Sequence, residues 1–137
     1  MKGAGLVLKT VKAIESDHYT PQPQDYSSAL KAAPKIHKET CRIDWNKTAS
    51  EIKNFIRGLS PYPAAWTEIN GKSCKIFKTI ISEDHSLGTP GEISTDHKTY
   101  IHFQCGKGKL SIEELQMEGK KRMNVEEFLR GNKLLKA

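Results

Sequence analysis

Histidines beside acids are the first residues to consider for catalysis, because a base and its orienting carboxylate are central to many active sites. Three histidines directly follow an aspartate, in the pairs Asp17–His18, Asp84–His85 and Asp96–His97. Catalytic partners are brought together by the fold and are seldom neighbours in the chain, so we interpret these residues as polar surface groups. The chain has no Gly-x-Ser-x-Gly motif, and no glycine-rich phosphate loop follows a strand. The sequence therefore predicts no self-sufficient active site.

The cysteines indicate neither a metal site nor a disulfide framework. Cys41, Cys74 and Cys105 are odd in number, more than thirty residues apart and without a Cys-x-x-Cys pair. The plain interpretation is free thiols in a reducing cytoplasm. No apolar run approaches the ~20 residues that span a bilayer, and residues 1–14 lack the features of a signal peptide. We expect a cytoplasmic protein with no metal and no membrane partner.

Positive charge is the more informative feature. The 137 residues carry 22 lysines and arginines against 16 acids, a net charge of +6. Residues 31–78 hold ten basic and four acidic side chains, residues 79–97 hold four acids and no base, and residues 98–137 hold nine bases and five acids. Segregated positive charge suits an anionic partner such as a nucleic acid, although each basic run is also compatible with an ordinary solvated face.

Two basic segments are the candidate phosphate-binding sites. They are the spaced series Lys31, Lys35, Lys38 and Arg42, and the run Lys120, Lys121 and Arg122. Arg57 is a further candidate, but it also stands near the predicted end of a helix, where a cation is favoured. Most aromatic residues, Trp66 among them, fall at positions that periodicity assigns to the core. Tyr100 alone falls on a polar strand face, where a base could stack.

The elements that must position these residues begin with helices. Helical spacing of apolar residues predicts an amphipathic helix that ends near Ser16, with the stripe Ala4, Val7, Leu8, Val11 and Ile14. Residues 17–41, rich in proline and polar residues, predict an extended linker. Thr48 and Glu51 form a capping-box pattern that starts a second helix, and Gly58 is suited to the left-handed turn that would end it.

From residue 65 the pattern changes to short strands. Asn70-Gly71 predicts a tight hairpin, and the expected strands are 65–69, 72–81, 91–95, 99–105 and 109–117, with a bulge near Glu113 or Glu114. A short helix from Asn124 to about Arg130 follows. Five antiparallel strands with tight turns predict a mainly β, α+β fold, a small oligonucleotide-binding-like barrel with one helix before it and a short one after it. The expected divisions are an N-terminal helix at 1–16, a linker at 17–41 and a barrel domain at 42–137.

Several sequence blocks are more specific than these patterns. The segment IDWNKTASEI at 43–52 continues as IRGLSPYPAAW at 56–66, and the blocks KIFK, GTPGEI and LQMEGKKRM follow at 75–78, 88–93 and 115–123. In this order they resemble the C-terminal domain of the methionyl-tRNA formyltransferase family. Residues 3–14 resemble the last helix of that family's catalytic domain, and APKI at 33–36 resembles its linker. The resemblance covers nearly the whole chain.

The resemblance implies a parent enzyme that transfers a formyl group from 10-formyltetrahydrofolate to initiator Met-tRNA in translation initiation. The family's Rossmann-like catalytic domain lies upstream and is absent here, so we expect this chain alone to be inactive, with no catalytic residue and no bound cofactor. The expected tRNA-binding residues are Lys35, Lys38, Arg42, Arg57, Lys120, Lys121 and Arg122. The expected partners are initiator tRNA, the catalytic domain of the parent chain and, through residues 3–15, a second copy.

Two alternatives remain open from the sequence. The chain could be the C-terminal domain of a related formyltransferase that acts on a sugar nucleotide or on folate. It could also be a stand-alone nucleic-acid-binding module. Affinity for tRNA separates the first expectation from the sugar-nucleotide or folate alternative.

Overall fold

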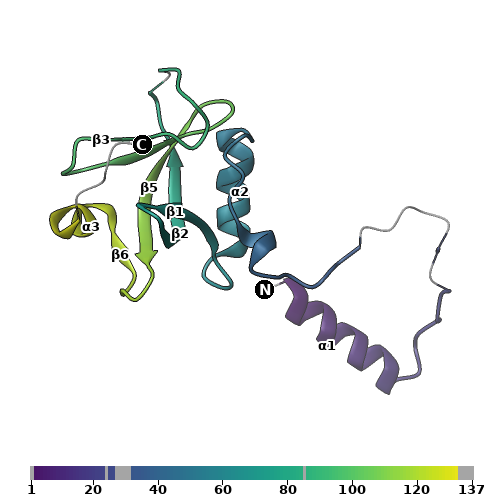
Figure 1. Cartoon of the computed structure of the whole chain (residues 1–137). Coiled ribbons are helices and arrows are strands. Elements are labelled where there is room, and N and C mark those ends of the chain that lie inside the picture. Colours follow the sequence, from purple (N-terminus) through teal and green to yellow (C-terminus); the bar gives the residue numbers. More distant parts are fainter. Residues whose placement is uncertain (1, 24, 27–31, 85, 133–137) are drawn as a thin grey trace. The chain divides into compact units, whose positions relative to one another are not determined.

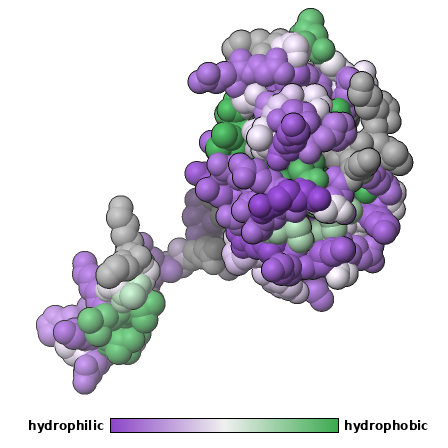
Figure 2. Space-filling view, turned by 90° about the vertical axis from the view of Figure 1, so that its left-hand side faces the viewer, coloured by the Kyte–Doolittle hydropathy of each residue, from purple (hydrophilic) through white to green (hydrophobic). Residues whose placement is uncertain are grey.

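The computed structural model describes residues 2–23, 25–26, 32–84 and 86–132, which fall into two units, Met1–Pro34 and Lys35–Ala137. The first unit contains helix α1 (Lys2–Glu15), so the predicted helix is confirmed. Its apolar side chains are more than half exposed, and Figure 2 shows them as hydrophobic surface on the smaller body: Leu6, Val7, Leu8, Val11 and Ile14. Within the described part of the chain, no helix has both the length and the hydrophobicity of a membrane span.

The second unit is built on a curled antiparallel half-barrel (Figure 1). Its strands are β1 (Ala65–Ile69), β2 (Lys72–Ile81), β3 (Ile93–Thr95), β4 (Ile101–Gln104), β5 (Lys109–Met117) and β6 (Met123–Asn124). The strand order is β1-β2-β5-β4-β3, and β6 pairs with β5. A short 3₁₀ helix η1 (Glu39–Cys41), helix α2 (Ala49–Leu59) and helix α3 (Val125–Gly131) complete the unit. The predicted α+β class and curled antiparallel sheet are confirmed.

Helix α2 begins and packs as its sequence predicts. The Thr48 side chain accepts a hydrogen bond from the backbone N–H of Glu51, and the Glu51 carboxylate accepts one from the backbone N–H of Thr48. This reciprocal cap satisfies two donors that the first turn otherwise leaves unpaired. The helix then lies beside the sheet (Figure 1) and buries one apolar stripe against it: Ala49, Ile52, Ile56 and Leu59.

The predicted end of α2 at Gly58 is wrong. The helix continues through Gly58 to Leu59, and Ser60 leaves it in an extended conformation with φ −83°. The left-handed residue comes later, at Ala64 with φ 72°, whose N–H donates to the Leu59 carbonyl. Pro61 and Pro63 cannot take the left-handed conformation themselves, because the proline ring fixes φ at about −65°.

The β1–β2 hairpin and the long β2–β5 pairing fix the register of the sheet. Asn70 and Gly71 both have positive φ, as a two-residue hairpin turn of the predicted type requires. In the β2–β5 ladder, Glu113 has no partner between Ile112 and Glu114, and Phe77 has none between Ile76 and Lys78. The predicted bulge is therefore confirmed, and a second bulge on the facing strand restores the register.

One glycine allows two segments to touch. The N–H of Gly106 donates to the carbonyls of Trp45 and Lys47 at 2.8 and 2.9 Å. A Cβ at this position would lie 1.9 Å from the carbonyl oxygen of Asn46, which no side chain can tolerate. This contact brings the segment before α2 against the β4–β5 turn, and Trp45 stacks on Phe103 with ring centroids 4.2 Å apart.

Candidate functional site

A row of three side chains crosses the sheet on the face that points away from the core. Trp66 on β1 lies opposite Lys75 on β2, and Lys75 lies opposite Gln116 on β5. These side chains are exposed or half-buried, whereas their strand neighbours on the other face are buried. The antiparallel register therefore collects one aromatic, one cationic and one amide side chain on a solvent-accessible surface.

Trp66 binds Lys38 and Arg42 of the first basic segment to this surface. Its indole Nε1 donates to the carbonyl oxygen of Lys38 at 2.8 Å. The Lys38 ammonium lies 5.5 Å from the centroid of the Trp66 ring, and the Arg42 guanidinium lies 5.3 Å from it. Arg42 also reaches the Glu68 carboxylate at 3.7 Å. Cations within about 6 Å of an aromatic ring are attracted by its quadrupole, so both cations are held beside the Trp66 ring.

A pocket of about 510 Å³ opens beside Trp66. Four segments line it: residues 36–38 with Cys41, residues 62–64 with Trp66, Ser73 with Lys75, and residues 116–119. All of these belong to the second unit. The charged side chains on its walls are Lys38, Lys75 and Glu118, and the aromatic ones are His37, Tyr62 and Trp66.

The second basic segment begins directly after another part of the same pocket lining. Gly119 lines the pocket, and the Gln116 amide donates to the carbonyl of Lys120 at 2.8 Å. Lys120 and Lys121 are exposed. Arg122 is tied down more firmly, because it pairs with the Glu114 carboxylate and lies 4.4 Å from the centroid of the Phe77 ring. The two segments that the sequence proposes as separate patches therefore flank one pocket.

The remaining predicted residues do not line this pocket. Lys35 is exposed and lies directly before the pocket residue Ile36. Arg57 is exposed in the last turn of α2, away from the pocket lining. Tyr100 is half-buried against His102, with ring centroids 4.4 Å apart. Lys31 lies outside the described residues.

Sequence reasoning missed four residues of this surface: Tyr62, Trp66, Lys75 and Gln116. The prediction that Trp66 is a core residue is wrong in one respect, since its ring packs at the edge of the core and carries two cations on the outer face. The hairpin turn could have revealed Lys75, because a two-residue loop at Asn70-Gly71 places Lys75 directly opposite Trp66.

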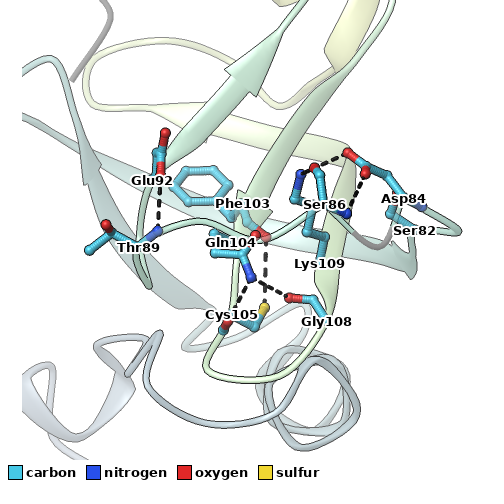
Figure 3. Close-up of polar contacts among 10 residues, drawn as sticks. All are labelled: Ser82, Asp84, Ser86, Thr89, Glu92, Phe103, Gln104, Cys105, Gly108 and Lys109. Carbon is cyan, nitrogen blue, oxygen red and sulfur yellow. Dashed lines mark hydrogen bonds and ion pairs between the residues drawn. The ribbon is translucent and has the colours of Figure 1, made fainter.

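A second polar cluster has a structural role. Figure 3 shows Lys109, on β5, directed at Asp84 and Ser86 of the loop that follows β2. The Lys109 ammonium is nearly buried and lies 2.7 Å from the Asp84 carboxylate. Its pairing holds the pKa of Asp84 well below the usual range, with hydrogen bonds from Ser86 as the next cause. Lys109 is thus neutralised internally and is not an exposed phosphate ligand.

The buried cysteine thiols are not activated for catalysis. Cys41, Cys74 and Cys105 are buried free thiols, and burial raises the pKa of Cys74 to about 12 and that of Cys105 to about 11. Both therefore stay protonated at neutral pH and are poor nucleophiles. For the His102 imidazole, burial has the opposite effect and lowers the pKa. Within the described ranges, no group of three histidine, cysteine or acidic side chains is placed to hold a metal ion.

The chain belongs to the family described as formyl transferase, C-terminal domain, whose profile matches residues 35–133.

Its similar relatives are methionyl-tRNA formyltransferases. The chain is 48% identical to that of Phocaeicola vulgatus, with 94% of this chain and 43% of the relative covered. It is 39% identical to that of Clostridium novyi, with 98% of this chain and 43% of the relative covered. The chain thus spans less than half the length of these relatives and corresponds to their C-terminal part.

Solved structures support the fold independently. A variant of HypX from Aquifex aeolicus matches with a TM-score of 0.63 and 22% identity, covering 93% of this chain and 23% of that chain. HypX in complex with tetrahydrofolic acid matches with a TM-score of 0.64 and 20% identity, covering 90% of this chain and 22% of that chain. At this identity the likeness concerns the fold alone.

Proposed function

We propose that the chain is the tRNA-binding part of a methionyl-tRNA formyltransferase, an enzyme that moves a formyl group from 10-formyltetrahydrofolate to initiator Met-tRNA. The observation that carries the proposal is the pair of basic segments that flank one pocket on the outer face of the sheet. The names of the similar relatives support the same assignment.

The arrangement suits the binding of a phosphate backbone. Lys38 and Arg42 are exposed yet held on Trp66, so they lose less freedom on binding than free side chains would. Lys75 adds a cation between them and the exposed Lys120 and Lys121. Cations spread over such a surface neutralise phosphates and position an RNA without reading its sequence.

Catalysis is assigned to a part of the parent enzyme outside this chain. Burial raises the pKa of Cys74 to about 12 and that of Cys105 to about 11, so neither thiol is an activated nucleophile at neutral pH. The chain alone is expected to produce no formyl-Met-tRNA from 10-formyltetrahydrofolate and Met-tRNA. Transfer above the uncatalysed background would contradict this expectation.

The binding proposal is tested with tRNA at several salt concentrations. If about five phosphates are neutralised, the logarithm of the affinity should fall with the logarithm of salt concentration at a slope near −4 to −5. The double charge reversal of Lys35 and Lys38 to Glu should weaken binding and flatten this slope. The double reversal Lys9→Glu with Lys12→Glu, at two exposed lysines on α1, changes the net charge equally and serves as the matched control. Equal affinity of the double variant and the unchanged chain at low salt would refute the proposed surface.

A further inference from the structure

The pocket between the two basic segments contains aromatic and polar side chains that phosphate binding does not require. Exposed cations on an open surface are sufficient for phosphates. This pocket instead has a volume of about 510 Å³, within the range of roughly 300–1,000 Å³ that small-ligand sites occupy. Aromatic side chains stand on its walls, and Gln116 and Ser73 contribute polar groups. These features are typical of a site that takes a flat, polar-edged ring.

Tyr62 supplies an aromatic surface at the rim. Its side chain is 87% exposed although it lies beside the pocket. It stands between Pro61 and Pro63, whose rings fix the backbone φ on both sides of it. The ring of Trp66 already carries Lys38 and Arg42. Tyr62 is therefore better placed than Trp66 to stack on an incoming ring.

The pocket lining also offers hydrogen-bonding groups. The Gln116 amide is oriented by its hydrogen bond to the Lys120 carbonyl. The neighbouring Ser73 hydroxyl and Lys75 ammonium add donors to the pocket lining. Nucleobases present donors and acceptors on their edges and a π-face for stacking, so a single base complements this lining.

We infer that the pocket receives one unpaired nucleobase of an RNA, stacked on Tyr62, while the flanking cations bind the phosphates on either side of it. This inference rests on the proposed function, because the flanking cations must first hold the RNA backbone. The base must be unpaired, since paired bases keep their edges and faces within the duplex.

The test compares two RNA hairpins on the full 137-residue chain. One carries a single bulged 2-aminopurine, and the other carries an abasic nucleotide at the same position, so that the phosphates are equal and only the base differs. The chain should bind the first hairpin roughly 5- to 100-fold more tightly, the range for stacking one base on an aromatic side chain. The 2-aminopurine fluorescence should fall on binding, because stacking quenches it.

Variants locate the base at Tyr62. Tyr62→Ala should abolish both the preference and the quenching, whereas Tyr62→Phe should retain them. Tyr26→Ala is the matched control, since Tyr26 is similarly exposed at 79% and lies in the first unit. Lys38→Gln should weaken binding of both hairpins equally and leave their ratio unchanged.

The outcomes distinguish the inference from the proposed function. Salt-dependent binding of both hairpins with equal affinity would overturn the base site and leave the phosphate surface intact. A preference that persists in Tyr62→Ala would also overturn the assignment. Saturation of the site by free adenosine monophosphate, with no preference between the hairpins, would assign the pocket to free nucleotides instead. Failure of both hairpins to bind at low salt would overturn the proposed function and the base site together.

Discussion

Trp66 and Lys38 contact each other in two ways at once. The indole N–H of Trp66 donates to the backbone carbonyl of Lys38 at 2.8 Å, and the Lys38 ammonium returns to lie 5.5 Å from the Trp66 ring centroid. The backbone N–H of Ile43 also donates to the Trp66 carbonyl at 2.8 Å. The segment around η1 is thus attached to strand β1 by two hydrogen bonds at Trp66, beside the ion pair of Arg42 with Glu68.

Substitution of Trp66 should therefore affect stability and RNA binding together. Trp66→Phe removes the indole donor and should lower the free energy of unfolding by about 0.5–1.5 kcal/mol. Trp66→Leu also removes two cation–π contacts, each worth about 0.5–1 kcal/mol at an exposed site, and should cost more. Urea denaturation measures the loss of stability. The affinity for tRNA should also fall more in Trp66→Leu than in Trp66→Phe. Unchanged values for Trp66→Leu would contradict this role.

The role of Trp66 shows where sequence reasoning reaches its limit. Periodicity assigns Trp66 an apolar environment, and part of its surface does pack on the core. The pattern contains no information that residues 38 and 42 fold back over the ring, because that contact spans up to 28 residues of chain. Charge spacing found Lys38 and Arg42, but only the register of the sheet brings them to Lys75 and the second basic segment.

Two glycines should respond oppositely to the same substitution. Gly58 lies inside α2, and apart from its chain neighbours and the backbone of its own helix a Cβ added there would meet no atom within 4 Å, so Gly58→Ala should stabilise the chain by about 0.5–1 kcal/mol. Gly106→Ala would place its Cβ 1.9 Å from the Asn46 carbonyl oxygen and should destabilise the chain by at least about 1–3 kcal/mol. Thermal or urea unfolding of both variants checks the pair, and a destabilised Gly58→Ala would show that helix propensity is not decisive there.

Locally encoded elements were the most predictable part of the fold. The cap at Thr48, the turn at Asn70-Gly71 and the bulge at Glu113 each depend on residues close together in the chain, and all three are confirmed. The end of α2 was not predictable in the same way. Gly58 has the right residue type for a left-handed cap, yet the chain reaches that conformation at Ala64, after Pro61 and Pro63.

Stability should decrease in acid partly through Asp84. The hydrogen bond from Lys109, followed by those from Ser86, holds the pKa of Asp84 below its ordinary value of 3.8. A carboxylate whose pKa is lower in the folded state stabilises the fold at all pH values above its unfolded pKa. This contribution is lost as the pH falls below about 4. Asp84→Asn should therefore be less stable than the unchanged chain at pH 7, and the two should converge as the pH is lowered towards about 2.

Urea midpoints at pH 7, 5, 4, 3 and 2 measure this convergence. Glu83→Gln is the matched control, because it neutralises the preceding exposed carboxylate and should leave the midpoint at pH 7 nearly unchanged. If the urea midpoints of Asp84→Asn and of the unchanged chain changed in parallel with pH, the contact with Lys109 would contribute nothing to folding.

The apolar stripe of α1 should cause the chain to associate with a second copy. A 14-residue helix is marginal in water alone, and the stripe exposes Val7, Leu8, Val11 and Ile14 by 53–64%. Burying each such side chain is worth roughly 1.5–3 kcal/mol before ordering costs, enough to favour pairing at high concentration. Light scattering should then give a mass that rises with concentration for the full chain, but not for a chain that starts at Tyr19. Val11→Lys should prevent association, whereas Thr10→Lys adds the same charge beside the stripe and should permit it. A monomeric full chain at the highest soluble concentration, with no extra hydrogen-exchange protection of α1, would show that the stripe does not self-associate.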